Sequence, residues 1–493
     1  MVILIKALQL ILALTILVVV HEFGHFITAR IFKTRVEKFY IFFNPNFSLF
    51  RCKKVHGKWR FAFFSKNVPE KYITHERIDP VTNKKETTYE SIDLSTLPSD
   101  DWRTDEDSTE FGIGWIPLGG YCKIAGMIDE SMDLEQMKQP AQPWEFRSKP
   151  AWQRLIVMVG GVVMNIITAY VIFTGLLISQ GSQYLPTSEV NKYGIQTSEV
   201  ARELGLKDGD KILSVNGKYI EDFSHVTMEL LLENSEYIEV ERNGEKVKVE
   251  LPEDAVAKII NNINNSTYLI KQREPFVIDG IGEGSIAQQV GMQKGDRIVK
   301  INDIDVPYFD DFSRNIVGFV NQNVTIAAIR NNDTLTFDIQ LSSDAKLGVI
   351  RASLLERKTQ EYTFFEAIPE GFHKTGKELS DYWKQLKIIF KPSNKAYESL
   401  GGFISIGSIF PSSFNWIVFW HWTAFLSIIL AVMNILPIPA LDGGHVLFLL
   451  YEIITRRKPN DKFMEIAQMV GLFLLLGLLI FANGNDVLRF IFK

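Results

Sequence analysis

The sequence predicts a polytopic α-helical membrane protein with four transmembrane helices, a β-hairpin near the membrane, and two β-rich domains inserted between helices. Uncharged stretches, a Gly- and aromatic-rich segment and an internal repeat predict these three parts. A chain of 493 residues is too long for one compact core, so several folding units are expected. Hydrophobic residues make up 46% and charged residues 23%, a balance that excludes intrinsic disorder.

The uncharged stretches cover residues 7–20, 155–179, 414–441 and 466–482. About 20 residues of helix cross a hydrocarbon core, so the second and third stretches are long enough. The first reaches that length only if its helix continues through 21–32. We therefore expect transmembrane helices at 1–33, 151–180, 414–455 and 463–484.

Lysine and arginine gather after the first stretch, before the second, and between the third and fourth. Because basic loops face the cytoplasm, both termini and the region between the second and third helices should lie on the outer side. A signal peptide at 1–20 is the alternative for the first stretch, but no small-x-small cleavage site follows it.

The outer region contains an internal repeat. Residues 205–216, GLKDGDKILSVN, recur as residues 291–302, GMQKGDRIVKIN. The Gly-Asp turn followed by an alternating strand resembles the GLxxGDxIxxxNG signature of PDZ domains, although Asn302-Asp303 departs from its last pair. We expect PDZ domains at 181–257 and 270–347, with peptides or proteins on the outer side as partners. The alternative is a pair of β-rich spacer domains without a ligand.

The rest of the chain falls into two connecting segments. The cytoplasmic segment, 34–150, carries a polar insert at 52–110, whose late acidic cluster is expected to be a solvated loop face. It also carries the hairpin, at 111–127. On the outer side, the connector 360–413 is expected to be amphipathic, either as an interfacial helix or as an ordinary connector helix.

His21-Glu22-Phe23-Gly24-His25 has the HExxH pattern. On a helix, His21 and His25 project from one face and can bind one Zn²⁺ ion, while Glu22 can reach a water on that ion. Without a metal, the two histidines would be hydrogen-bonded residues at a helix end near the cytoplasmic interface. That alternative gives Glu22 no role.

A catalytic zinc needs a third protein ligand. Asp442 ends the third uncharged stretch, and an ionisable residue inside a membrane is a candidate functional residue. His445, three residues later, is the rival ligand. Asp442 could instead cap a helix that begins after the break at Pro437 and Pro439.

The composition excludes two other classes of protein. Only two cysteines occur, Cys52 and Cys122, which argues against a disulfide framework. The net charge of −5 shows no basic excess, so nucleic acid is not an expected partner.

The motif pair HEFGH at 21–25 and NILPIPALDGG at 434–444 resembles the site-2 protease family. The chain is most similar to the regulator of sigma-E protease group, which carries tandem PDZ domains between its second and third spans. Residues 114–121 and 160–165 also match, so the resemblance covers nearly the whole chain. It implies an intramembrane zinc metalloendopeptidase of the bacterial inner membrane, with extracytoplasmic PDZ domains and termini.

The resemblance also implies roles for single residues. His21, His25 and Asp442 match the zinc ligands, Glu22 the catalytic base, and Asn434 a residue that holds the substrate strand. The hairpin would be re-entrant and would bind substrate, and its matching residues are Gly114, Ile116, Leu118, Gly119 and Gly120.

The implied substrates are single-span membrane proteins, such as anti-sigma factors or signal-peptide remnants, cleaved in envelope-stress or sigma-factor signalling. Two departures limit the resemblance: the insert is long, and Phe403 stands where relatives usually have proline. The alternatives are a non-catalytic PDZ-bearing membrane scaffold with a relict metal site, and a membrane-tethered protease that cleaves soluble proteins.

Overall fold

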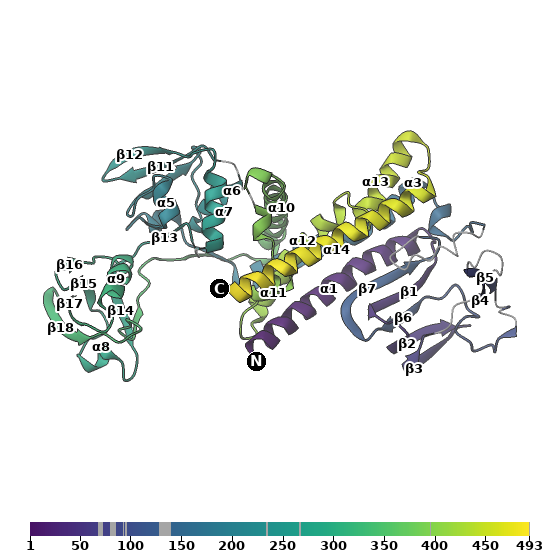
Figure 1. The fold of residues 1–493 in the computed structure, drawn as a ribbon, viewed down its shortest axis with the longest axis horizontal. Helices are drawn as coiled ribbons and strands as arrows, with labels where there is room; N and C mark the ends of the chain where they lie inside the picture. The colour runs from purple at the N-terminus through teal and green to yellow at the C-terminus, as the bar shows by residue number, and fades with distance from the viewer. Residues whose placement is uncertain are drawn as a thin grey trace. The chain divides into compact units, whose positions relative to one another are not determined.

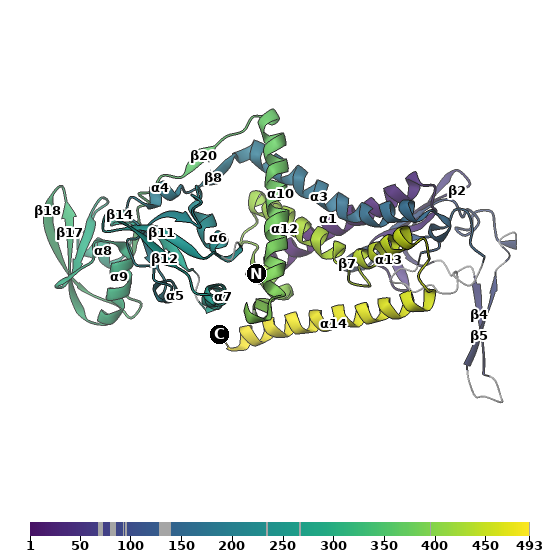
Figure 2. The same ribbon diagram turned by 90° about the horizontal axis from the view of Figure 1, so that it is seen from above.

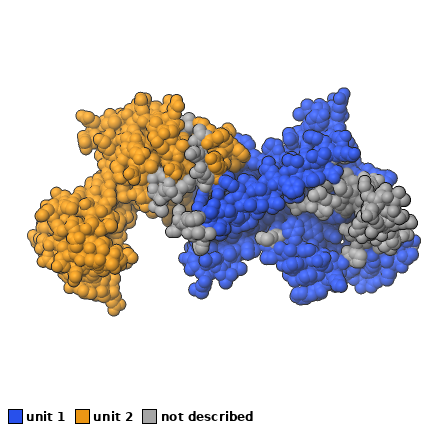
Figure 3. All heavy atoms as spheres, viewed as in Figure 1, with its two compact units in different colours: residues 1–179, 362–383, 400–493 blue, residues 180–361, 384–399 orange. Residues whose placement is uncertain are grey.

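The computed structural model describes residues 1–67, 72–78, 85–91, 93, 96–127, 140–232, 235–265, 268–394 and 396–492. The chain divides into two compact units, which Figure 3 colours separately. Unit 1 contains residues 1–179, 362–383 and 400–493, and unit 2 contains residues 180–361 and 384–399.

Unit 1 holds the long apolar helices (Figure 1). They are α1 (Val2–Ile31), α3 (Ala151–Gln180), α12 (Trp416–Ile435) and α14 (Asp461–Phe492). Within the described part of the chain, these four are the helices long and apolar enough to cross a membrane. The prediction of four such helices is confirmed, and the HExxH motif lies inside α1 because that helix continues well past residue 20.

The third predicted span, 414–455, is not one continuous helix. α12 ends at Ile435 and a second helix, α13 (Asp442–Thr455), begins after a six-residue loop. Pro437 and Pro439 cannot donate backbone hydrogen bonds, so the helical ladder is interrupted there. Ala440 in this loop has a φ of +75°, which turns the chain into α13.

Unit 1 also contains a five-stranded sheet. Its strands are β1 (Val36–Phe43), β2 (Phe47–Val55), β3 (Lys58–Lys66), β6 (Glu110–Ile113) and β7 (Ile116–Ile124). Their order across the sheet is β3-β2-β6-β1-β7. β7 is therefore an edge strand, and it runs beside α1 (Figure 2).

The predicted β-hairpin at 111–127 is wrong, because β6 and β7 do not pair with each other. β1 lies between them, parallel to β6 and antiparallel to β7. The connection crosses the end of β1, where Gly114 donates its N–H to the Ile41 carbonyl at 2.7 Å. A side chain at 114 would overlap the backbone of Phe43, so glycine is needed for this crossing.

The polar insert contains regular secondary structure. It includes all of β3 and a separate antiparallel pair, β4 (Tyr72–Ile78) with β5 (Lys85–Ser91). The acidic cluster is not simply a solvated face, because Arg35 forms ion pairs with Glu106 at 3.2 Å and with Asp107 at 2.8 Å.

Unit 2 contains two β-rich modules, each with its own hydrophobic core. The first module comprises β9 (Ile195–Thr197), β10 (Lys211–Val215), β11 (Tyr237–Arg242), β12 (Glu245–Glu250) and β13 (Ile270–Gln272), with α6 (Val226–Leu232) and α7 (Ala255–Asn265). The second comprises β14 (Phe276–Ile281), β15 (Arg297–Ile301), β17 (Asn323–Arg330), β18 (Asp333–Gln340) and β19 (Val349–Arg351) in one sheet, with α9 (Phe309–Ile316).

The internal repeat forms the same contacts in both modules. Asp210 is buried and accepts hydrogen bonds from Arg242, which also donates to the carbonyl of Gly205. Asp296 does the same with Arg330, which donates to the carbonyl of Gly291. The aspartate of the Gly-Asp motif thus forms a structural ion pair with an arginine in each module. The PDZ assignment itself stays a prediction.

The connector contains α10 (Phe364–Ile389) and α11 (Phe403–Ser408). α10 packs closely on α3, since a side chain at Gly371 would overlap Thr174. At the start of α11, the Phe403 N–H donates to Asn483 Oδ1 of α14 at 3.1 Å. A proline at this position would lack this donor.

Candidate metal centre

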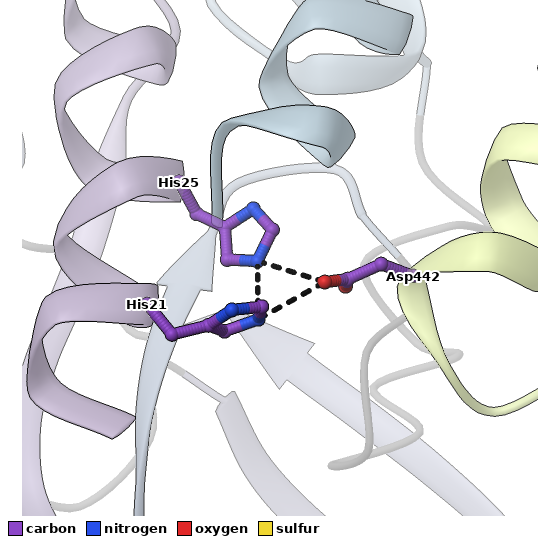
Figure 4. Close-up of side chains that lie close together, drawn as sticks. All are labelled: His21, His25 and Asp442. Atoms are coloured by element: carbon purple, nitrogen blue, oxygen red, sulfur yellow. Dashed lines mark hydrogen bonds and ion pairs between the residues drawn. The ribbon is translucent and has the colours of Figure 1, made fainter. Parts of the chain in front are cut away.

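Two helices bring three ligand-type side chains together (Figure 4). His21 and His25 project from one face of α1 toward Asp442, the first residue of α13. The Asp442 Oδ2 atom lies 3.0 Å from His21 Nε2 and 3.3 Å from His25 Nε2. The two Nε2 atoms are 3.2 Å apart, and both histidines are buried.

These distances fit a zinc ion. Zinc binds histidine nitrogen and carboxylate oxygen at about 2.0–2.2 Å, so two ligand atoms of a tetrahedral site lie about 3.3 Å apart. The Asp442 Oδ2 atom is buried and makes no hydrogen bond to a described residue. A carboxylate oxygen left in that state is costly, and a metal ion would satisfy it. Within the described residues, this is the group of His, Cys, Asp or Glu side chains arranged to hold a metal.

α3 orients both imidazole rings. His25 Nδ1 donates to the carbonyl oxygen of Val157 at 2.9 Å, which leaves the Nε2 lone pair free for a metal. The side-chain amide of Asn165, fully buried on the same helix, lies 3.2 Å from His21 Nδ1. Both rings are therefore held at Nδ1, the nitrogen that faces away from Asp442.

Two glycines of α3 make this arrangement possible. A Cβ atom at Gly161 would lie 2.6 Å from His25 Nε2 and 2.7 Å from His21 Nε2. A Cβ atom at Gly160 would lie 2.7 Å from the carbonyl oxygen of Gly24, where α1 and α3 cross. Any larger residue at 161 would occupy the space of the metal centre.

Two further residues, Glu22 and Asn434, lie next to the histidine pair. Glu22 is half-buried, and its charge acts on the His25 imidazole. Asn434, near the end of α12, places its amide nitrogen 3.2 Å from His21 Nε2. Both predicted site residues thus lie beside the histidine pair.

The structure answers two of the alternatives left open by the sequence. His445 Nε2 lies 3.0 Å from the amide nitrogen of Gln468 in α14 and is not part of the His21–His25–Asp442 group. The N-cap position of α13 is Leu441, so Asp442 is not the capping residue.

Besides Asn434, the five other predicted substrate-binding residues lie along one stretch of chain. Gly114 is in the connection that crosses the end of β1, whereas Ile116, Leu118, Gly119 and Gly120 belong to β7. The placement of the Leu118 side chain lies outside the described residues. A Cβ atom at Gly120 would lie 3.4 Å from Val18 Cγ1, so β7 passes close to α1 one turn before His21.

Sequence reasoning gave no role to three contributors: the Val157 carbonyl, and Gly161 and Asn165 within the matching segment 160–165. A signal was present for two of them, because Gly161 and Asn165 are four residues apart and share a helix face. The Val157 carbonyl has no side-chain signature and required the tertiary structure.

Comparison with known proteins decides the family. The pattern of Peptidase family M50 matches residues 9–65 and 98–478, which is most of the chain. The chain belongs to peptidase family M50. The internal unmatched stretch of this M50 peptidase, 66–97, lies inside the polar insert.

Three relatives illustrate the similarity. The regulator of sigma E protease of Haemophilus influenzae is 27% identical over 416 residues, covering 78% of this chain and 89% of the relative. A protein of Rickettsia conorii, provisionally named a zinc metalloprotease, is 24% identical over 97% of both chains. A Clostridium perfringens protein with the same description is 23% identical, again over 97% of both.

Proposed function

We propose that this M50 peptidase is a zinc metalloendopeptidase that cleaves single-span membrane proteins within or near the bilayer. The observation that carries the proposal is the meeting of His21, His25 and Asp442 beside Glu22, inside or next to apolar helices. The names of the relatives support zinc as the metal. A zinc ion held by these three residues would lower the pKa of a water molecule and polarise the scissile carbonyl.

Glu22 has the position of a general base. It follows His21 directly on α1, so its carboxylate can take a proton from the attacking water and return it to the leaving amine. Its half-buried setting next to His25 keeps it close to the reacting groups.

The edge of β7 offers a binding site for the substrate backbone. A transmembrane substrate hides its peptide bonds in helical hydrogen bonds, and unwinding it in lipid requires new partners. In the described structure β7 pairs only with β1, so its other edge can accept a substrate strand by strand addition. The Asn434 amide, beside His21, would hold that strand near the reacting groups.

The cellular setting follows from charge and resemblance. Basic loops favour an orientation with the metal centre near the cytoplasmic face and unit 2 outside the cytoplasm, in a bacterial inner membrane. Anti-sigma factors shortened by a prior cut and signal-peptide remnants are the substrates we expect, because both would present a single span without a large outer domain.

The direct test is Glu22→Gln in the purified protein. We expect wild-type zinc content, because Glu22 is not among the converging ligands, with cleavage of a reporter span lowered by at least about 100-fold. Cleavage at the wild-type rate would refute the catalytic assignment. A wild-type protein that binds no zinc and cleaves no span would instead favour the scaffold alternative.

The metal ligands are tested by Asp442→Ala. Removal of this carboxylate leaves two ligands, so elemental analysis should show a clear loss of zinc. His445→Ala is the matched control and should retain zinc, because His445 lies with Gln468. The opposite pattern would move the third ligand to His445.

A further inference from the structure

An ion pair outside the metal centre joins two of the helices that form it. Arg154 lies in the first turn of α3, and its Nη2 atom donates to Glu452 Oε1 of α13 at 2.5 Å. Both side chains are mostly buried, with 11% and 13% exposed. The Arg154 Nε atom also donates to the Lys149 carbonyl at 2.9 Å, which anchors the guanidinium on the chain that leads into α3.

The helix that carries Glu452 near its end carries Asp442 at its beginning. Helix α13 rises about 1.5 Å per residue, so the two carboxylates lie roughly 15 Å apart along its axis. Any slide or tilt of α13 against α3 would therefore move Asp442 relative to His21 and His25. A ligand must stay within about 0.5 Å of its productive position, so even a small movement would weaken the metal centre.

Little of α13 is buried. Its large exposed apolar side chains are Leu447, Leu450, Tyr451, Ile453 and Ile454. In its second half, Leu449 is buried in one hydrophobic cluster with Val157 and Met158 of α3. Apolar packing has no preferred direction, whereas a charge-assisted hydrogen bond fixes both a distance and an orientation. The ion pair thus adds the directional contact between these two helices.

One face of α3 serves both ligand-bearing helices. Arg154, Val157, Gly161 and Asn165 follow one another at spacings of three and four residues, which places them along one side of a helix. The first of them contacts α13, and the other three contact the histidine pair of α1. The imidazole rings and the helix of the third ligand are therefore held against the same surface.

We propose that Arg154 and Glu452 are positioning residues of the metal centre: their ion pair fixes α13 on α3 in the register that brings Asp442 to the two histidines. This role rests on the proposed metalloprotease function, and the pair acts through Asp442 because neither residue is among the converging ligands. A mostly buried ion pair suits the role, since two apolar residues can stabilise a fold as well but specify its register less sharply.

Three variants of the full chain, purified in detergent and freed of metal, separate positioning from stability. Glu452→Gln and Arg154→Met each break the ion pair, and Arg154→Met combined with Glu452→Met replaces it with two apolar side chains. Each variant is titrated with Co²⁺, whose visible absorption depends on its coordination geometry. Thermal unfolding is measured on the same metal-free samples.

We expect both single variants to bind Co²⁺ about 3- to 30-fold more weakly than the wild type, with weaker tetrahedral absorption at saturation. The methionine pair should unfold at a higher temperature than either single variant, because it leaves no buried charge unpaired. It should nevertheless bind Co²⁺ as weakly as they do. Recovered stability without recovered affinity is the result that a positioning role requires.

Arg103→Met is the matched control. The Arg103 side chain is 17% exposed and pairs with Asp101 at 2.8 Å, but this ion pair joins two residues of the polar insert. We therefore expect its Co²⁺ affinity and absorption to match those of the wild type, even if its unfolding temperature falls.

Three outcomes would overturn the proposal. Wild-type Co²⁺ affinity in the methionine pair would show that the ion pair serves stability alone. An equal loss of affinity in Arg103→Met would show a general response to a lost ion pair. A wild-type chain that binds no Co²⁺ would refute the metal centre itself, so failure of the proposed function is distinguishable from failure of the positioning role.

Discussion

At the residue scale, the metal centre depends on a glycine, Gly161 of α3. Gly161 has no Cβ, and this lets α3 pass directly against both imidazole rings. On the same helix, Val157 contacts His25 Nδ1 and Asn165 contacts His21 Nδ1. Close packing and ring orientation therefore come from one short segment of α3. Mutation of the neighbours that orient metal-binding histidines typically lowers metal affinity by 10- to 100-fold.

We expect Gly161→Ala to lower zinc affinity by at least about tenfold, since the new Cβ would lie within 2.7 Å of ring atoms of both histidines. Competition with a fluorescent chelator measures the affinity. Gly175→Ala on the same helix is the control, because a Cβ atom there meets no other atom within 4 Å. Equal affinity in the two variants would contradict this account of Gly161.

At the element scale, the short loop between α12 and α13 places Asn434 and Asp442 at one site. Gly443 and Gly444 allow the first turn of α13 to pack on the loop, since a Cβ at Gly444 would lie 2.7 Å from Pro439 Cα. α14 supports the loop from another side, where a Cβ at Gly471 would overlap the carbonyl group of Pro439. α14 thus supports the metal centre indirectly, by packing on the loop that contains Pro439.

Gly471→Val should therefore displace the loop and weaken zinc binding, although Gly471 contacts none of the proposed ligands. Gly477→Val, also in α14 and surrounded by open space, should leave zinc binding unchanged. Zinc titration of both variants gives the comparison. Loss of zinc in both would point to general damage of α14 instead.

The second module gives a pH-dependent prediction. Burial raises the pKa of Asp296, but the hydrogen bonds from Arg330 and the Gln293 N–H outweigh it, so the pKa lies below its ordinary value. A carboxylate with a lowered pKa stabilises the fold above its unfolded pKa of about 3.9, and this contribution is lost as the pH falls through the folded value. The module should therefore loosen only in strong acid.

Asp296→Asn should mimic that loss near neutral pH. We expect amide hydrogen exchange in β15 and β17 to become about tenfold to hundredfold faster, because the half-buried Arg330 guanidinium loses its charged partner. Asp279→Asn is the control: its ion pair with Lys294 is exposed, and exposed pairs contribute little. Unchanged amide exchange in Asp296→Asn would contradict a structural role for the repeated Gly-Asp motif.

At the scale of the whole molecule, unit 2 is an insertion whose main ends meet. β8 (Ser182–Tyr184) pairs with β20 (Lys358–Gln360), so Gln360 lies opposite Ser182. The chain therefore enters and leaves the two modules at neighbouring points. This arrangement permits both modules to be removed without stretching the remainder of the chain.

Replacing residues 183–359 with a short Gly-Ser linker tests whether the modules exclude bulky substrates. We expect this variant to cleave membrane proteins that still carry a folded outer domain, which the intact protein should reject. Gel analysis of an intact precursor beside its shortened form measures the difference. The same deletion combined with Glu22→Gln is the control, and continued rejection of the precursor would argue against exclusion.

The sequence by itself determined the four apolar helices, the repeat and the polar residues of the centre. These features are local: hydropathy reports length in lipid, and HExxH sets two side chains on one helix face. Asp442 was identifiable because an ionisable residue beside an apolar span is costly without a partner.

Only the tertiary structure decided how these parts combine. The pairing order of β1, β6 and β7 depends on a crossing at Gly114, and neighbours in sequence need not be neighbours in a sheet. The choice of Asp442 over His445 arose from which side of α13 faces α1, which two prolines and the turn at Ala440 set. The contribution of Val157 came from a backbone carbonyl, which has no pattern that a sequence can display. The spacing of Gly161 and Asn165 set them on one helix face, but only the tertiary structure showed that this face meets the two histidines.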